Sequence, residues 1–320
     1  MSIGSTIGKV AQTKEKSTTN QQINAIEVNG KNNNNFIYSL LEKHSNNIRA
    51  GASTQAVPIL NKTSFSLLEF NMPKIIEQEK IGQLFRQIDN LITLHQRKYD
   101  NLVKVKKSLL EKMFPKNSSN VPEIRFKGFV DAWEQRKFDS LAKIDRGLTY
   151  SPTDLNNNGI RVLRSSNIDE DYFKLYDEDV FVNPESINID FANNNDILIT
   201  SANGSSRLVG KHAIISGTSS NSTVHGGFML LAKPYINSYF LNASMSSNWY
   251  KKFIDLYVAG GNGAIGNLSK TDLDNQLVHV PKEREIIKIG ELFKNLDNLI
   301  TLHQHKELKR RKDKNEHLRW

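Results

Sequence analysis

The sequence predicts an α+β protein in which mixed α/β domains are separated by long antiparallel coiled-coil helices. The main observation is a repeat: residues 81–98, IGQLFRQIDNLITLHQRK, recur without a gap at 289–306 as IGELFKNLDNLITLHQHK, with 13 of 18 positions identical. Apolar residues of heptad spacing run through this repeat, and short β-branched runs lie between its two copies. A period of 208 residues is far longer than a solenoid unit of about 20–50 residues, so two whole modules are implied.

Length and composition are typical of a soluble protein with about two domains. The chain has 320 residues, of which 38% are hydrophobic and 24% are charged. It has no apolar run of about 18 residues and no apolar segment near Met1, so no membrane span and no signal peptide are predicted. The absence of cysteine excludes disulfides and cysteine-based metal sites, and it favours a cytoplasmic location. A formal net charge of +9 favours a polyanionic partner.

Helical periodicity is clearest from Pro73 to Phe114, where apolar residues recur at spacings of four and three. The seam positions that we predict for the coiled coil are Leu84, Ile88, Leu91, His95 and Leu102 in the first copy, and Leu292, Leu296, Leu299 and His303 in the second. The second seam is apolar only as far as Leu299, and the two copies diverge after Lys306. A helix from 75 to 114 would be about 60 Å long. Two such helices, packed antiparallel, would hold two modules at a fixed distance.

His95 and His303 occupy the same seam position in the two copies. We favour a polar layer that fixes the register of the helices. The alternative is a metal-binding or pH-sensing pair, but no acidic cluster accompanies these residues. The other histidines lack the spacing of metal ligands, so no metal site is predicted.

Strand-like runs fill the second module, which follows a linker at 115–122. They lie at 161–163, 180–182, 196–200, 212–215 and 227–231, and helical spacing follows at 238–257. The first module is shorter: Gly8-Lys9 matches Gly210-Lys211 and residues 35–38 match 238–241, but nothing in 1–72 matches 122 to about 197. We therefore predict a partial first domain at 1–72, a first long helix at 73–114, a complete second domain at 115–281 and a clipped second helix at 282–320.

Motifs for catalysis are missing from the sequence. The string GNGAIG at 261–266 fits the G-x-G-x-x-G pattern of dinucleotide sites, but the matching positions 53–58 have no glycine and end in proline. The motifs of P-loop proteins, zinc proteases and serine hydrolases do not occur. The string at 183–185, Asn-Pro-Glu, lacks the N-P-P-[FY] pattern of an adenine methyltransferase. We therefore predict a binding protein without catalytic residues of its own.

Polar residues recur in predicted loops, where a protein that reads DNA needs hydrogen-bond donors. Arginine and lysine suit guanine edges and phosphates, and asparagine and glutamine suit adenine edges. The candidates in the second module are Arg161, Arg164, Ser165, Asn167, Ser201, Asn203, Ser205, Arg207 and Lys211, and those in the first are Lys9, Asn20, Gln21 and Gln22.

Four features of the sequence resemble the specificity subunit of type I restriction–modification systems. They are TIGKVA with TNQQINAI (6–11 and 19–26), the duplicated IGxLFxxxDNLITLHQ, SLLEKMFP (108–115) and VPEIRFKGFVDAWEQRKF (121–138). In this family the first of these lies midway through a target-recognition domain, and an ending like SLLEKMFP is absent here after Lys306. The resemblance thus implies one complete and one partial recognition domain, with one complete and one clipped long helix.

The resemblance implies a DNA-binding subunit with no active site. Each recognition domain would enter the major groove of double-stranded DNA and read one half of a split target, and the helices would set the spacing. The same helices would dock modification (methyltransferase) subunits, which carry S-adenosylmethionine, while restriction subunits add cleavage that depends on ATP and magnesium. Self-association through the long helices is a further expectation. Two alternatives stay open: a coiled-coil module that binds protein, and a non-functional fragment of a specificity subunit.

Overall fold

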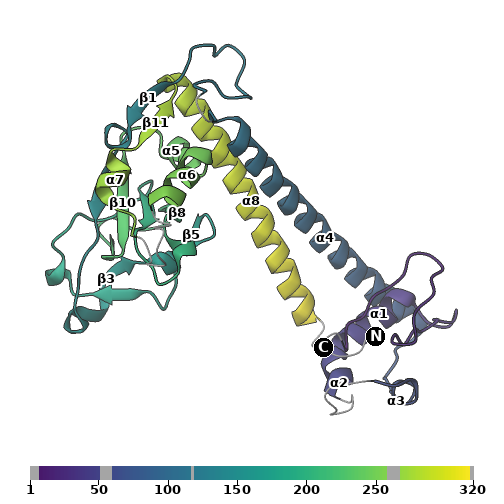
Figure 1. Cartoon of the computed structure of the whole chain (residues 1–320). Helices are drawn as coiled ribbons and strands as arrows, with labels where there is room; N and C mark the ends of the chain where they lie inside the picture. The colour runs from purple at the N-terminus through teal and green to yellow at the C-terminus, as the bar shows by residue number, and fades with distance from the viewer. Residues whose placement is uncertain (1–6, 51–59, 117–118, 258–266, 318–320) are drawn as a thin grey trace. The chain divides into compact units, whose positions relative to one another are not determined.

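The computed structural model of the chain describes residues 7–50, 60–116, 119–257 and 267–317 (Figure 1). The chain falls into two units, the first formed by 1–101 with 300–320 and the second by 102–299. Helices and sheets are both present, which confirms the predicted α+β class. None of the described helices is both long enough and apolar enough to cross a lipid bilayer. The glycine-rich string at 261–266 lies outside the described residues.

The second unit contains all the strands that the structure describes. A four-stranded antiparallel sheet has the order β2 (Ala142–Arg146), β10 (Met229–Pro234), β7 (Ile197–Thr200), β8 (His212–Ile214). In a three-stranded sheet, β3 (Leu155–Leu163) is antiparallel to β6 (Val180–Val182) and parallel to β9 (Thr223–His225). The two remaining pairs are β1 (Glu134–Lys137) with β11 (Leu277–Val280) and β4 (Ile168–Asp169) with β5 (Tyr172–Phe173). Each predicted strand overlaps an observed one.

Helices and single 3-10 turns complete the second unit. The helices are α5 (Ser238–Met245), α6 (Asn248–Tyr257) and α7 (Lys270–Asp274). The 3-10 turns are η2 (Phe138–Ser140), η3 (Pro152–Asp154), η4 (Ser165–Asn167), η5 (Pro184–Ser186) and η6 (Ser206–Leu208). The predicted helical segment at 238–257 is thus confirmed as two helices, α5 and α6.

The four-stranded sheet separates two apolar clusters, which explains why β7 is apolar at consecutive positions. Ile197 and Ile199 belong to a cluster that contains Phe240 of α5, whereas Leu198 between them belongs to a second cluster with Leu231 of β10. Successive side chains of a strand point to opposite faces of its sheet, so a sheet covered on both sides has no exposed position. All four residues of β7 are accordingly buried.

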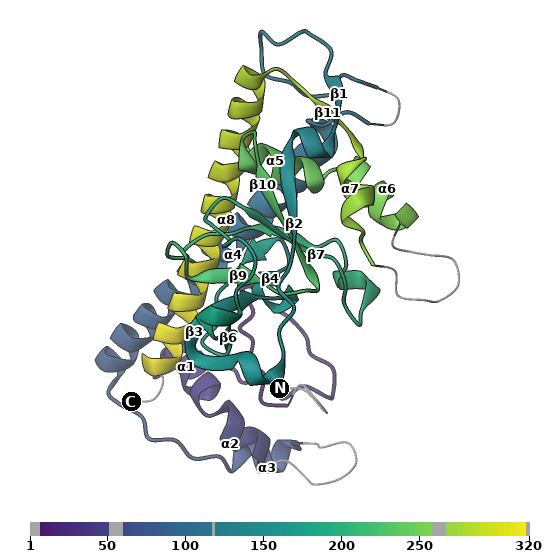
Figure 2. The same cartoon turned by 90° about the vertical axis from the view of Figure 1, so that its left-hand side faces the viewer.

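The first unit has a much smaller apolar core. Its short helices are α1 (Asn34–Lys43), α2 (Ser45–Ala50) and α3 (Lys62–Ser66) (Figure 2). One cluster joins Leu41, Ile48 and Leu60, and another is formed by Phe85, Ile88 and Ile92 of the long helix. None of the described residues of this unit forms a strand.

The two long helices are confirmed as α4 (Ile75–Lys112) and α8 (Glu283–His317). Their first residues are 208 positions apart, the offset of the repeat. Each helix starts two residues after a proline, Pro73 or Pro281, where the fixed backbone angle of proline suits a helix entry. A helix of 38 residues is about 57 Å long.

The observed seam of these helices differs from the predicted seam: every second seam position is shifted by one residue along the chain. Phe85 and Ile92 are 1% and 9% exposed, whereas the predicted Leu84 and Leu91 are 48% and 36% exposed. The prediction is therefore wrong at those two positions and right at Ile88. Where two apolar residues are adjacent, heptad spacing alone has two solutions that share half of their members, and packing selects one of them.

The same shift occurs in the second copy. Phe293 and Ile300 are buried, while the predicted Leu292 is half-buried and the predicted Leu299 is 43% exposed. Leu296 is buried as predicted, and Leu102 of the first copy packs at the edge of the larger core cluster.

One pair of ion pairs between the helices is equivalent in the two copies even beyond Lys306. In the second unit, Lys106 Nζ of α4 is 2.7 Å from Asp297 Oδ1 of α8. In the first unit, Lys314 Nζ of α8 is 2.7 Å from Asp89 Oδ1 of α4. The two lysines are 208 residues apart, as are the two aspartates. The two sequences do diverge after Lys306, but this lysine is kept in both copies and makes the equivalent buried contact, which apolar periodicity does not detect.

The domains themselves also repeat their local geometry. Gly8 and Gly210 both have positive φ, of 87° and 83°, a region that favours glycine. A Cβ at Gly8 would collide with the backbone of α2, and one at Gly210 would collide with Ile254 of α6. The predicted match of Gly8 with Gly210 is therefore confirmed in the backbone.

The N-caps of α1 and α5 show which residues of the two domains correspond to each other. Asn33 Oδ1 accepts a hydrogen bond from Phe36 N at 3.1 Å, and Asn237 Oδ1 accepts one from Phe240 N at 3.0 Å. Each cap lies against a glycine of a long helix, Gly82 or Gly290. Phe36 therefore corresponds to Phe240. The predicted match of 35–38 with 238–241 is wrong by one residue, because loops of different length change the offset along the chain.

Candidate nucleic-acid interface

Two polar loops of the second domain, both selected from the sequence, meet in the structure. Asn203 Nδ2 donates a hydrogen bond to Ser165 Oγ at 2.9 Å, across 38 positions of sequence. The Asn203 side-chain oxygen accepts a hydrogen bond from the Ser205 backbone N–H at 3.0 Å, which shapes the turn before η6. The short turn η4 presents Ser165, and η6 carries Arg207. We call these two loops, 164–167 and 201–207, the polar loop pair.

Among the predicted DNA contacts in the polar loop pair, Arg164, Ser205 and Arg207 are exposed, while Ser165, Ser201 and Asn203 are half-buried. Long cationic side chains thus extend from a base of short polar ones. This arrangement offers both phosphate contacts and hydrogen bonds to base edges. Lys211, just beyond the second loop, is half-buried.

Asn167 is a structural residue, and its predicted DNA contact is wrong. It is fully buried, and its amide donates to Lys174 O at 2.9 Å and to Asp179 Oδ1 at 2.8 Å. Its side-chain oxygen accepts from Arg164 N at 2.8 Å. All these partners lie within the domain, so no polar atom of Asn167 is left for a ligand.

Arg161 is also held within the domain. Its Nε is 3.6 Å from Asp179 Oδ2, and its guanidinium lies 5.0 Å from the ring centroid of Phe181. The side chain is 20% exposed. Arg161 therefore makes its contacts inside the domain, next to the loop that begins at Arg164, and is not free to contact DNA as predicted.

Phe228 is a residue that sequence reasoning missed. The sequence predicts a strand at 227–231, but β10 begins at Met229 and Phe228 is 74% exposed. Its carbonyl accepts hydrogen bonds from Ser201 N at 2.9 Å and Ala202 N at 3.1 Å, so its backbone is fixed beside the polar loop pair. The sequence signal was the preceding Gly226-Gly227, which is typical of a turn. An exposed aromatic ring beside cationic and amide groups suits contact with nucleic-acid bases.

Three of the four candidates of the first domain, Asn20, Gln21 and Gln22, lie in one turn. Lys9, Asn20, Gln21 and Gln22 are all exposed. Asn20 Oδ1 accepts a hydrogen bond from Gln22 N at 3.0 Å, which closes the turn. Their side chains are therefore available to a partner, and a DNA contact here stays a prediction.

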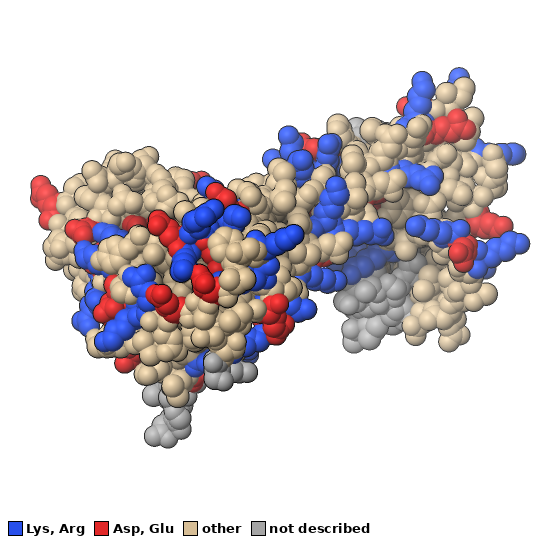
Figure 3. Space-filling model, turned by 90° about the horizontal axis from the view of Figure 1, so that it is seen from above, with Lys and Arg blue, Asp and Glu red and all other residues tan. Residues whose placement is uncertain are grey.

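Charge on the molecular surface is mixed in sign. Figure 3 shows lysine and arginine side chains interspersed with aspartate and glutamate on the face that it displays. Several lysines of the second domain are paired, as Lys143 and Lys233 are with Asp190 at 3.2 and 3.1 Å. The net charge of +9 is therefore not gathered in one patch on that face.

His95 and His303 meet across the helix pair of the first unit. Their Nδ1 atoms are 3.0 Å apart, so one neutral imidazole donates to the other. Burial lowers the pKa of both histidines, and the nearby Lys98 and Lys306 lower it further. Asp89 contacts Lys314 while His95 contacts His303, so positions rise along α4 as they fall along α8. The helices of this unit are thus antiparallel, and the histidines form a polar layer. No cluster of three or more metal-ligating side chains occurs among the described residues.

Two apolar pairs on the long helices are exposed in both copies of the repeat. Leu91 and Leu299 are 36% and 43% exposed, and Leu94 and Leu302 are 46% and 44% exposed. Each pair is 208 residues apart and identical in residue type. Packing within the chain does not explain their exposure, and we call these four leucines the duplicated surface.

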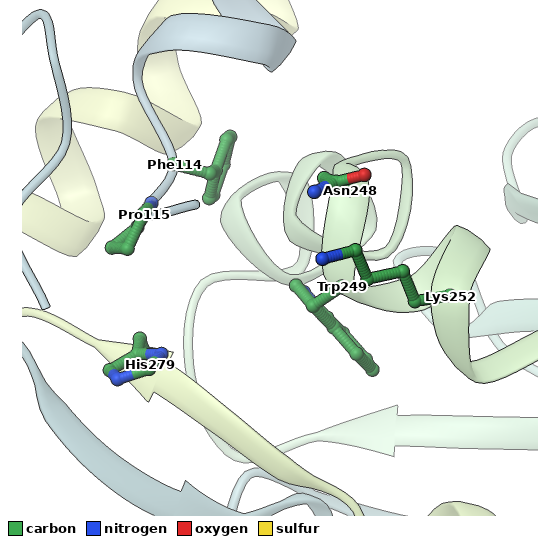
Figure 4. A pocket seen from close by; sticks show the side chains of 6 residues that line it. All are labelled: Phe114, Pro115, Asn248, Trp249, Lys252 and His279. Atoms are coloured by element: carbon green, nitrogen blue, oxygen red, sulfur yellow. The ribbon is translucent and has the colours of Figure 1, made fainter. Parts of the chain in front are cut away.

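A small cavity lies beside α6, at the end of α4 (Figure 4). Its volume is about 70 Å³, and its lining includes Phe114, Trp249, Lys252 and His279. Small-molecule sites usually measure about 300–1,000 Å³. The lining has no carboxylate and no paired nucleophile and base, so this cavity lends no support to a catalytic role.

Comparison with known proteins decides the family. The model of the type I restriction modification DNA specificity domain matches residues 1–104 and 131–310. The chain belongs to the family of type I restriction–modification specificity subunits. The specificity subunit of type I restriction enzyme MjaVIII from Methanocaldococcus jannaschii is similar to it, with 22% identity over 286 residues. That alignment covers 83% of this chain and 64% of the length of the archaeal subunit.

Solved structures show that this specificity subunit shares its fold with others. The S subunit of a type I system from M. genitalium aligns with a TM-score of 0.61 and 14% identity, over 89% of this chain and 71% of that one. A chain from a structure on complex assembly and conformational transition of the type I system aligns with a TM-score of 0.51 and 13% identity, over 88% of this chain and 69% of that one. The resemblance predicted from the sequence is thereby confirmed.

Proposed function

We propose that this specificity subunit reads double-stranded DNA through the polar loop pair of its second domain. The observation that carries the proposal is the Asn203–Ser165 hydrogen bond, which joins two loops chosen for their DNA-reading residue types. Arg164 and Arg207 would contact phosphates or guanine edges, and Asn203 would contact an adenine edge. The first domain would contribute Lys9, Asn20, Gln21 and Gln22 to the other half of a split target.

The duplicated surface supports a second part of the proposal, the docking of modification (methyltransferase) subunits. Leu91 and Leu94 on α4 and their equivalents Leu299 and Leu302 on α8 would each receive one such subunit. Chemistry would reside on the partners: S-adenosylmethionine on the modification subunits, and ATP with magnesium on restriction subunits. This chain would then act without catalysis of its own.

The DNA-reading proposal is tested by arginine substitutions in the complex with the modification subunits. Arg207→Ala should weaken binding to the cognate duplex by about 1–3 kcal/mol if the side chain contacts a base. If it contacts a phosphate, binding to all sequences should weaken alike and the salt slope should fall by about one unit. Arg136→Ala is the control, since Arg136 is exposed on β1, outside the polar loop pair. Unchanged binding by both Arg207→Ala and Arg164→Ala would refute this interface.

The docking proposal has its own test. Leu94→Asp together with Leu302→Asp should abolish co-purification with the modification subunit, because a charge would enter an apolar contact. The control is Leu308→Asp, since Leu308 is 54% exposed on α8 but its repeat equivalent is Asp100. If DNA binding is absent while docking persists, the chain is instead a coiled-coil module that binds protein. If both are absent, it is a non-functional fragment.

A further inference from the structure

An apolar groove opens on the first unit. Its volume is about 550 Å³, and it lies between residues 23–26, helices α1 and α3, and residues 68–72. Ile23, Ile26 and Met72, which line it, are 41%, 48% and 40% exposed. A hollow of this size with apolar side chains exposed along it is large enough for several side chains of another segment.

The internal repeat identifies the equivalent place in the second domain. Helix α3 begins 208 residues before α7, so Phe65 corresponds to Leu273. At the same offset, Phe70 and Met72 correspond to Val278 and Val280 of β11. The three second-domain residues are at most 2% exposed, whereas Met72 is 40% exposed. What is a closed core in the second domain is therefore an open groove in the first.

A single segment closes that place in the second domain. Trp133, Phe138, Leu141 and Ile144 are buried in the same apolar cluster as Leu273 and the β11 residues. The segment also pairs through its backbone: β1 is antiparallel to β11, and β2 is antiparallel to β10. Phe138 N donates to Gln276 O at 2.9 Å. One extended stretch of chain thus supplies both the apolar side chains and the strand partners.

Among the described residues of the first unit, none packs in the groove in the way that residues 133–146 pack in the second domain. Residues 69–72, which correspond to β11, form no strand among the described residues. Within the described part of the first unit, the groove therefore stays open and no strand lies beside residues 69–72.

We propose that this groove binds an extended segment of a separate polypeptide, the N-terminal part of a recognition domain. The segment would follow the pattern of Trp133 to Ile144, an aromatic residue followed by Phe, Leu-Ala and Ile at the same spacing. It would add a strand beside residues 69–72 and place its apolar residues against Ile26 and Phe65. The first domain would then be completed in trans. This inference concerns the folding of the first domain and is independent of DNA binding.

The test uses a fluorescent peptide with the sequence of residues 131–146 and the full chain. Fluorescence anisotropy should show saturable binding, and a scrambled peptide should not bind. Ile26→Asp should weaken binding at least tenfold, because it places a charge in the groove. Leu67→Asp is the matched control and should bind as the parent does, since Leu67 is 76% exposed and does not line the groove.

Hydrogen exchange identifies where the peptide lies. Residues 23–26 and 69–72 should gain protection when it binds, and residues 277–280 of the second domain should not. Equal binding to the parent and to Ile26→Asp, or no saturable binding, would overturn the proposal. A chain that is already dimeric, with the groove protected and with Ile26→Asp making it monomeric, would also overturn it, because the occupant would then be a second copy.

Discussion

At the scale of single residues, the hydrogen-bond partners of a polar side chain decide whether it can read DNA. Asn167 and Asn203 are both asparagines in the polar loop pair. Asn167 is buried, and every polar atom of its side chain is hydrogen-bonded inside the domain. Asn203 is half-buried, and its side chain bonds only to Ser165 Oγ and Ser205 N within the polar loop pair. The sequence predicted both as DNA contacts because residue type and loop position are the same. Only the three-dimensional environment separates them, since Lys174 and Asp179, which bind Asn167, lie 7 and 12 residues away and no local pattern links them to it.

Phe228 should contribute to DNA binding and little to stability. Its ring is 74% exposed, so Phe228→Ala removes few contacts within the protein. If the ring is fully covered by DNA, its loss should weaken binding by about 1.5–3 kcal/mol. Thermal melting and binding to cognate duplex are the two measurements. A lowered melting temperature with unchanged affinity would assign Phe228 to the fold instead of the interface.

His225 should make the second domain less stable in acid. Burial lowers the pKa of this fully buried imidazole to about 4, from an ordinary value of 6.5. As pH falls below about 6.5, His225 therefore takes up a proton in the unfolded chain but not yet in the folded protein. The contribution of His225 to stability is complete above that pH and is lost between about 6.5 and 4. The difference in pKa corresponds to about 3 kcal/mol of unfolding free energy.

The measurement for His225 is chemical unfolding of the second domain in the full chain at several pH values. His212, whose pKa burial also lowers, adds to the loss in the same direction. The comparison is therefore His225→Gln. This change should reduce the pH dependence of the unfolding free energy between pH 6.5 and 4 by the contribution of one proton. An unchanged dependence would show that His225 is protonated in the folded state.

At the scale of elements, the two long helices are held by equivalent polar contacts as well as by apolar ones. Lys314 lies close to Asp89 and Glu42 and over the ring of Tyr38 at 5.8 Å. Burial works to lower the pKa of Lys314, but the hydrogen bonds to the two carboxylates outweigh it and raise the pKa. A charge so placed joins α8 to both α4 and α1. The repeat equivalent, Lys106, lies over Tyr172 of β5 at 5.2 Å.

Lys314→Met should destabilise the first unit by about 1–3 kcal/mol. The stem length is similar, but two half-buried carboxylates, Glu42 and Asp89, would lose their cation, which costs less than the same loss at fully buried carboxylates. Hydrogen exchange at α1 and the end of α8 should rise, while β7 and β10 of the second unit stay protected. Lys312→Met is the control, because the Lys312 side chain is 78% exposed. Equal effects of the two changes would mean that the ion pairs contribute nothing specific.

The helices could be predicted from the sequence, but their packing faces could not be fully predicted. The repeat predicts both α4 and α8, because with 13 identical positions a helix in one copy implies a helix in the other. The seam needed a choice between adjacent residues such as Leu84 and Phe85. Both are apolar, and the decision depends on the shape of the facing helix, which periodicity does not contain. The ion pairs of Lys314 could not be predicted from apolar periodicity, because they join charged side chains.

At the scale of the whole molecule, the two units differ in how much apolar surface they bury. The second unit has three clusters, one of which extends from Met113 to Leu296. The domain of the first unit depends on Leu41, Ile48 and Leu60, with Ile23 and Ile26 left exposed. Burying one large aliphatic side chain contributes about 1.5–3 kcal/mol, and whole domains are stable by only about 5–15 kcal/mol. Leaving a few large apolar side chains exposed therefore removes most of the stability margin of a small domain.

Limited proteolysis should reveal this asymmetry. Under native conditions, the earliest cuts should fall between residues 7 and 72, while residues 119–257 resist, because local opening is easiest where few apolar contacts are lost. Adding the peptide of residues 131–146 should slow the early cuts if the groove of the first unit accepts it, and it should not change cleavage of the Ile26→Asp chain. Equal resistance of both domains without peptide would mean that the first domain is stable as it stands. Its groove would then be a surface feature of a complete small domain, with no need for a strand from outside.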